Sequence, residues 1–157
     1  MDIEVGTGAT LVHLDPGEAL HDGVIAAFEK SQRRLPIVVS CIGSLRSIDY
    51  GLAACDDDGI VGPGLRFQRT DDAIEIGGIQ GHVGIDADGN LSPHLHGVVF
   101  GRTGECFGGH IFEAVTLITM EFALIGERAP GWSRVHEPVL GSPPLPLLKP
   151  EPSRSHG

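Results

Sequence analysis

The stretch SPHLHGVVFGRTGECFGGHIFEA, residues 92–114, contains two apolar runs separated by the turn-forming segment GRTGE. Five-residue loops that contain glycine commonly join antiparallel strands. In the simplest register Phe100 pairs with Cys106 across this loop. The stretch therefore predicts a β-hairpin and, with it, an antiparallel sheet.

The same register predicts a cluster of imidazoles. Counting back from the loop, His96 lies opposite His110, and paired residues on neighbouring strands point to the same face. His94 shares the face of His96, because side chains two residues apart on a strand point the same way. Three imidazoles are thus expected close together on one face of the sheet.

The preceding hairpin adds a fourth histidine to this face. The sequence DADGN, residues 86–90, is typical of a hairpin loop and would pair Ile85 with Leu91. His82 then lies opposite His94. A shift of one residue in either register would turn the affected histidine to the other face.

Histidines in this arrangement suggest a metal site. Three neutral imidazoles are typical of zinc sites that keep one coordination position open for water or a substrate. The candidate ligands of a divalent metal, with zinc expected, are His94, His96, His110 and His82. Beside them, Gly97, Gly108 and Gly109 would let the backbone or another molecule approach closely. Hydrogen-bonded histidines at an interface are the alternative.

Outward from this stretch, the chain predicts more strands. Short β-branched or alternating segments bounded by turn residues occur at 10–14, 37–43, 47–54, 65–70 and 73–85, and the last strand continues to 125. An acidic loop is expected at 55–64. Together with one early helix, about seven strands predict an α+β domain with the helix packed on a mainly antiparallel sheet.

The helix is predicted from an apolar face and a capping box. Leu20, Val24, Ala27 and Phe28 share one side at helical spacing. Before them, Asp15 is a suitable N-cap, with Pro16 at the first helical position and Glu18 completing the box. The helix is expected to end near Arg33 or Arg34.

The chain divides into a domain, residues 1–126, and a C-terminal tail, residues 127–157, that holds most of the eleven prolines. Proline disfavours regular helices and central strands. We therefore expect an extended tail, packed in part on a neighbouring surface through Trp132 and its apolar runs, with full disorder as the alternative.

Composition limits the function. The net charge is −10, and the eleven basic residues form only one cluster, at Lys30, Arg33 and Arg34. Since nucleic-acid binders usually carry a basic face, strong direct DNA binding is not expected. No apolar run is long enough for a membrane span, and the N-terminus lacks a signal-peptide pattern. Three cysteines without a CxxC motif suggest reduced thiols, so a cytoplasmic protein is expected.

Known catalytic motifs are missing from the sequence. It contains no GxSxG, no HExxH and no glycine-rich phosphate loop, so no catalytic residue is assigned. A protein that is not an enzyme is the preferred interpretation.

The segment PHLHGVVFGRTGECFGGHIFEA resembles the signature of the plants-and-prokaryotes-conserved (PPC) domain. This domain occurs in plant AT-hook nuclear-localised proteins and as free-standing bacterial and archaeal proteins. LVHLDPGEALHDGVIAAFEK, VVSCIGSLRSIDYGL and AIEIGGIQGHVGIDADGN resemble other parts of the same domain, so the resemblance covers residues 8–126.

The resemblance implies a mixed α+β fold, assembly as a homotrimer and a metal-type site at His94, His96 and His110. It also implies a DNA-binding or transcription-associated function, although this chain has no AT-hook. We therefore expect a trimeric assembly or regulatory module that acts with protein partners. One alternative is a metal-dependent enzyme or small-ligand-binding protein that uses the same three histidines. The other alternative is a protein that binds DNA directly.

Overall fold

One helix and eight strands make up the described part of the computed structural model. The structure describes residues 1–33, 36–55, 57, 61–86, 88–126, 132–137 and 145–150. The elements are β1 (Asp2–Val5), β2 (Thr10–Leu14), α1 (Leu20–Ser31), β3 (Ile37–Cys55), β4 (Val61–Ile85), β5 (Leu91–Phe100), β6 (Cys106–Ile125), β7 (Trp132–Glu137) and β8 (Leu145–Pro150).

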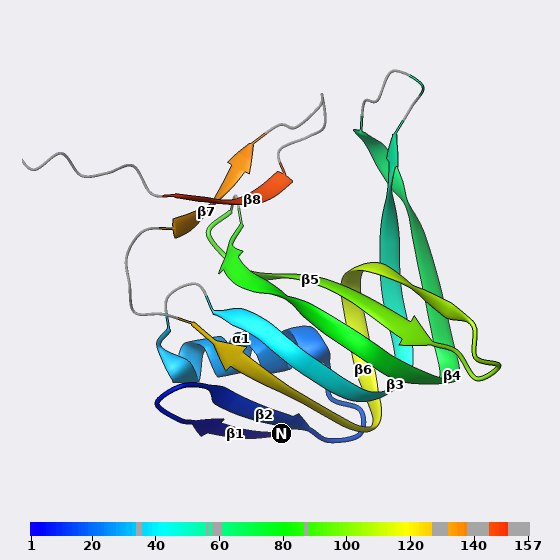
Figure 1. Cartoon of the computed structure of the whole chain (residues 1–157), viewed down its shortest axis with the longest axis horizontal. Helices are drawn as coiled ribbons and strands as arrows, with labels where there is room; N and C mark the ends of the chain where they lie inside the picture. Colours follow the sequence, from blue (N-terminus) through cyan, green and yellow to red (C-terminus); the bar gives the residue numbers. More distant parts are fainter. Residues whose placement is uncertain are drawn as a thin grey trace, which may run out of the picture.

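Six strands form the main antiparallel sheet, in the order β1-β2-β6-β3-β4-β5. The sheet also closes on itself, because the first residues of β6 pair with β5 while later residues of the same strand pair with β3 and β2. Strands β3 to β6 therefore form a ring, and α1 packs along the sheet near β2 and β6 (Figure 1). The predicted α+β class with one helix on an antiparallel sheet is confirmed.

Strands β3 and β4 are longer than the sequence predicts. The segments 37–43 and 47–54 belong to one strand, as do 65–70 and 73–85, because irregularities in pairing replace the expected turns. The far ends of the two strands project from the sheet as an arm (Figure 1). The expected acidic loop is shortened to the residues between Cys55 and Val61, of which 56 and 58–60 lie outside the described residues.

The helix begins later than predicted. Its N-cap is Ala19, and the expected N-cap at Asp15 is wrong. The Asp15 amide does donate to Glu18 Oε2 at 2.8 Å, but within a turn that precedes the helix. The reason is competition from the sheet, since the Thr116 amide donates to the Glu18 carbonyl at 2.9 Å and keeps this segment paired with β6.

The C-terminal end of α1 is tied to the sheet by its basic residues. Lys30 Nζ donates to the Ile3 carbonyl at 2.7 Å, and Arg33 Nη1 donates to the Gly126 carbonyl at 3.0 Å. The predicted end near Arg33 is close to the observed end at Ser31. Two members of the single basic cluster therefore bind the protein's own backbone.

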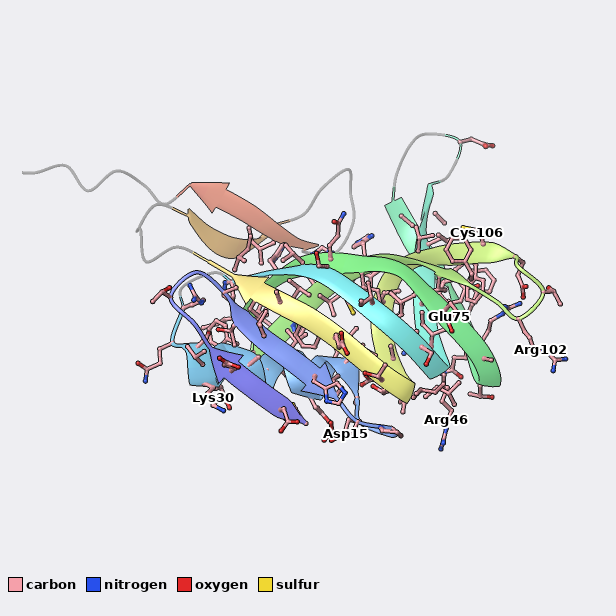
Figure 2. All side chains as sticks on the ribbon, turned by 60° about the horizontal axis from the view of Figure 1, so that its bottom comes forward. Asp15, Lys30, Arg46, Glu75, Arg102 and Cys106 are labelled. Carbon is pink, nitrogen blue, oxygen red and sulfur yellow. The ribbon has the colours of Figure 1, made fainter. Side chains whose placement is uncertain are left out.

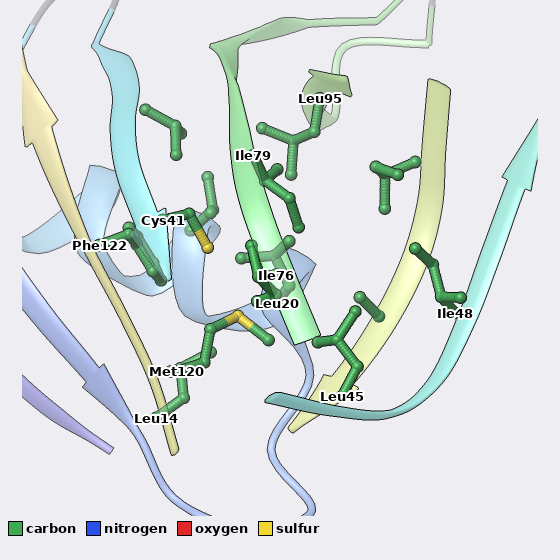
Figure 3. Packing of buried hydrophobic residues seen from close by; sticks show 14 of the residues in the cluster. Leu14, Leu20, Cys41, Leu45, Ile48, Ile76, Ile79, Leu95, Met120 and Phe122 are labelled. Carbon is green, nitrogen blue, oxygen red and sulfur yellow. The ribbon is translucent and has the colours of Figure 1, made fainter. Parts of the chain in front are cut away.

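The core lies between α1 and the concave side of the sheet. Leu20 of the helix is fully buried, together with Leu14, Met120 and Leu95 from three strands (Figure 3). Val24 of the helix is fully buried as well. Cys41 is buried in the same cluster, and burial raises the pKa of its thiol to about 12. No helix among the described residues is long and apolar enough to cross a membrane.

The predicted extended tail contains a hairpin. Within residues 127–157, strand β7 pairs antiparallel with β8, while 127–131, 138–144 and 151–157 lie outside the described residues. In a two-stranded ribbon each strand has a free edge, so proline can be accommodated where its nitrogen faces away from the partner strand. Pro146 and Pro150 of β8 show that a proline-rich composition did not prevent a strand here.

Candidate metal centre

Two hairpins position the four histidines as the sequence predicts. In the β5–β6 pair, Phe100 lies opposite Cys106 and His96 opposite His110. In the β4–β5 pair, His82 lies opposite His94. Both predicted registers are confirmed.

The histidines lie on the face of the sheet that points away from the core. On β5 the buried residues are Leu95 and Val99, so His94 and His96 point outward. His110 likewise precedes the fully buried Ile111. An ion can therefore reach the imidazoles from outside. The strands that carry these imidazoles are held in place by the core.

Three of the imidazoles converge. One ligand atom each from His94, His96 and His110 can be chosen so that all lie within 4.8 Å of one another. The Nε2 atoms of His94 and His96 are 3.2 Å apart. In a tetrahedral zinc site with bonds of about 2.0–2.1 Å, two ligand nitrogens are separated by roughly 3.3 Å. The spacing of the three side chains thus fits a divalent metal ion.

His82 occupies a different position from the other three. Its ring meets the ring of His94 edge-on, with centroids 5.2 Å apart, but its ligand atoms do not belong to the converging group. The structure therefore places it beside a candidate ligand, and its role as a ligand stays a prediction.

The three glycines make room for the protein's own chain. A Cβ at Gly97 would lie 2.6 Å from Ile79 Cγ1, on the core side of the sheet. At Gly108, with φ of 148°, it would lie 2.0 Å from the Gly97 carbonyl oxygen, and at Gly109, with φ of 138°, 2.3 Å from that of Gly51. Of the two possibilities that the sequence left open, close approach of the backbone is the one observed at Gly108 and Gly109, while the approach of another molecule stays a prediction.

Sequence reasoning missed an aromatic and charged neighbour of the site. The Phe112 ring packs at a tilt of 57° against His110, with centroids 4.5 Å apart, and the guanidinium carbon of Arg66 lies 4.4 Å from the Phe112 centroid. Arg66 belongs to β4 and is 46 positions from Phe112 in the chain, a contact that no local motif predicts. The ring reaches this position because β6 has an irregularity where Asp49 and Tyr50 pair with Glu113 and Ile111, leaving Phe112 unpaired.

A buried carboxylate holds Arg66 in place. Arg66 Nε donates to Asp49 Oδ1 at 2.8 Å, Arg66 Nη2 donates to Asp49 Oδ2, and Gln68 Nε2 donates to the same oxygen at 3.2 Å. The Asp49 side chain is 11% exposed, whereas that of Arg66 is 59% exposed. The hydrogen bonds from Arg66 hold the pKa of the Asp49 carboxyl below its ordinary value.

The model of the Plants and Prokaryotes Conserved (PCC) domain family matches residues 3–126 of the chain. No curated protein matches the sequence. Among solved structures, a "putative DNA-binding protein" from Bacteroides thetaiotaomicron is similar with a TM-score of 0.74 and 16% identity, covering 98% of each chain.

Two archaeal structures are also similar to this chain. A metal-containing protein from Archaeoglobus fulgidus has a TM-score of 0.68 and 25% identity, with 93% of this chain and 96% of that chain covered. A plant- and prokaryote-conserved (PPC) protein from Pyrococcus horikoshii has a TM-score of 0.67 and 19% identity, with 91% and 93% covered. Relatives as distant as the Bacteroides and Pyrococcus proteins show a common fold.

Proposed function

This chain belongs to the Plants and Prokaryotes Conserved domain family, and we propose that it is a metal-binding assembly module. It forms a homotrimer in which His94, His96 and His110 of each chain hold one divalent ion, with zinc expected. The module acts in a transcription-associated role through protein partners. Its own surface does not bind duplex DNA tightly.

The observation that carries this proposal is the convergence of three ligand atoms within 4.8 Å on two paired strands. The A. fulgidus relative, which is metal-containing, supports the same property for this chain. A zinc ion held by three neutral imidazoles would act as a Lewis acid at its open position. The chain's own contribution is to hold the backbone of the three histidines in register through the β5–β6 hairpin.

Exposed apolar side chains on three neighbouring strands support the homotrimer. Ile118 of β6 is 67% exposed, Leu11 of β2 is 57% exposed and Ile42 of β3 is 55% exposed. These three strands, β2, β6 and β3, are neighbours in the sheet. Extended apolar patches on a monomer commonly mark an interaction surface, and copies of the chain would cover this one.

Assembly and metal content can be tested together. We expect light scattering to give about three times the 16.5 kDa mass of one chain, and elemental analysis of the same fraction to give one zinc per chain. A mass of one chain at micromolar concentration would refute the trimer. Well under one metal per chain, after purification without chelator, would refute the metal site.

Charge is the reason for proposing that DNA is reached through partners. The structural relative from B. thetaiotaomicron is named a "putative DNA-binding protein", but this chain carries a net charge of −10, and three copies would repel a polyanion more strongly. Lys30 and Arg33 are engaged with backbone carbonyls, and Lys30 lies at the opposite end of the molecule from Arg102 (Figure 2).

In a gel-shift titration with generic duplex DNA at moderate salt, we expect no binding tighter than about 1 μM, because few cations are available to displace counterions from the phosphates. The same titration at low salt provides the control for weak electrostatic attraction. Binding below micromolar that weakens steeply as salt is raised would contradict the proposal and favour direct DNA binding.

A second function is supported by the open coordination position. Structural zinc sites commonly have four protein ligands. Catalytic zinc sites commonly have three and leave the fourth position open. The exposed edge of the site, where His96 lies, is where a small molecule could reach the ion. A small-ligand-binding protein, or an enzyme built on the same ligands, is therefore the alternative function.

A further inference from the structure

Arg66 and His110 lie in one row across the sheet, beside the metal centre. Gly51 of β3 pairs with Arg66 of β4 on one side and with His110 of β6 on the other. Directly paired residues point to the same face, and neighbouring strands are about 4.8 Å apart. Arg66 and His110 therefore point outward from positions roughly 10 Å apart.

An aromatic ring fills the space between these two residues. Gly51 has no side chain, and a Cβ there would lie only 2.8 Å from Phe112 Cε2, so the glycine leaves room for the ring. The ring contacts His110 on one side and the Arg66 guanidinium on the other. With 39% of Phe112 exposed, the row offers an apolar surface between the candidate metal centre and a cation.

Arg66 keeps hydrogen-bonding capacity for a second acceptor. A guanidinium has five N–H donors, and the salt bridge to Asp49 uses Nε and Nη2. Among the described residues, no protein acceptor hydrogen-bonds Nη1. Because Asp49 accepts hydrogen bonds from Nε and Nη2, the guanidinium, and Nη1 with it, is held in place before any ligand arrives.

The charge of the loaded site favours an anion. Three neutral imidazoles leave the charge of a divalent ion uncompensated, in contrast to thiolate sites. An anionic group would therefore be a favourable fourth ligand, and guanidinium groups pair well with carboxylates. The open position of the metal and the Arg66 guanidinium both attract anions, and the Phe112 ring lies between them.

We propose that the site binds a small dicarboxylate, with one carboxylate at the open position of the metal, the other on Arg66, and the carbon chain over Phe112. This inference rests on the proposed metal site, and it names the class of ligand that the metal site binds. Binding involves no covalent change in the ligand.

The test compares glutarate with valerate, which has the same chain length and one carboxylate. By isothermal titration calorimetry, the zinc-loaded protein should bind glutarate about tenfold more tightly than valerate, since one hydrogen-bonded charge pair separates the two ligands. Arg66→Gln should remove this preference and leave valerate binding unchanged. Arg46→Gln, at an exposed arginine of β3 outside the row, should keep it.

A further variant controls for the loss of the salt bridge. Arg66→Gln leaves Asp49 without its guanidinium, so D49N/R66Q, which removes both charges, should show the same loss of preference with zinc still bound. Equal affinities for glutarate and valerate in the zinc-loaded wild type would overturn the dicarboxylate inference alone. Failure of the wild type to hold zinc would overturn the metal site and this inference with it.

Discussion

Replacing His96 with alanine should abolish metal retention after dialysis and lower the Tm of the zinc-loaded protein by about 5–10 °C. Removing one of three converging ligands leaves two imidazoles, which hold zinc poorly. An ion present at a hundredfold excess over its Kd stabilises the folded state by about 2.7 kcal/mol, which corresponds to several degrees for a chain of this size.

His13→Ala is the matched control for this experiment. His13 lies on β2, near the carboxylates of Asp2 and Asp15 at 3.9 Å, and it does not belong to the converging group. It should change neither zinc content nor the response to chelator. With chelator present, wild type and His96→Ala should melt at similar temperatures, because the exposed His96 side chain then stabilises little. A wild-type Tm that chelator leaves unaltered would contradict the expectation.

Replacing Gly108 with alanine should destabilise the protein by roughly 3 kcal/mol and weaken zinc binding. The backbone at this position has a φ of 148°, and the added Cβ would lie 2.0 Å from the Gly97 carbonyl oxygen. To relieve this clash, β5 and β6 must separate at the pair Gly97–Gly109, which lies directly beside the pair of His96 and His110. Chemical denaturation and zinc titration of the variant would measure the two effects.

Gly78→Ala supplies the comparison for Gly108→Ala. Gly78 is also a strand glycine, but no atom lies within 4 Å of the position its Cβ would take, and its φ is not positive. The substitution should be neutral or slightly stabilising, because alanine reduces the entropy of the unfolded chain. Equal stability of the two variants would show that the close approach of β5 and β6 can relax at little cost.

The hairpins could be predicted because their loops are local. GRTGE and DADGN fix the pairing of the residues on either side, and the positions of His82, His94, His96 and His110 follow from counting. The helix was located from its apolar spacing, but its first residue was not. The competing partner of that segment, Thr116, is about a hundred residues away in the chain and carries no local signal.

Other features depend on contacts between distant segments. Strand β1 has a short sequence, DIEV, in which only Ile3 packs against the core, so its pattern is too weak to identify a strand. The continuous β3 and β4 contain pairing irregularities that resemble turns in sequence. The row of Arg66, Phe112 and His110 depends on β3 lying between β4 and β6, which composition and spacing do not specify.

The closure of the ring has a kinetic consequence for the metal. Strand β5 is hydrogen-bonded to β4 along one edge and to β6 along the other, so the backbone beneath His94 and His96 is held on both sides. Backbone amides in such doubly paired strands open rarely, whereas half-exposed imidazoles rotate on far shorter timescales. Ion entry and departure would then be limited by rotation of the imidazole rings and by loss of water from the ion. The empty protein would keep the backbone of the histidines in register between one ion and the next.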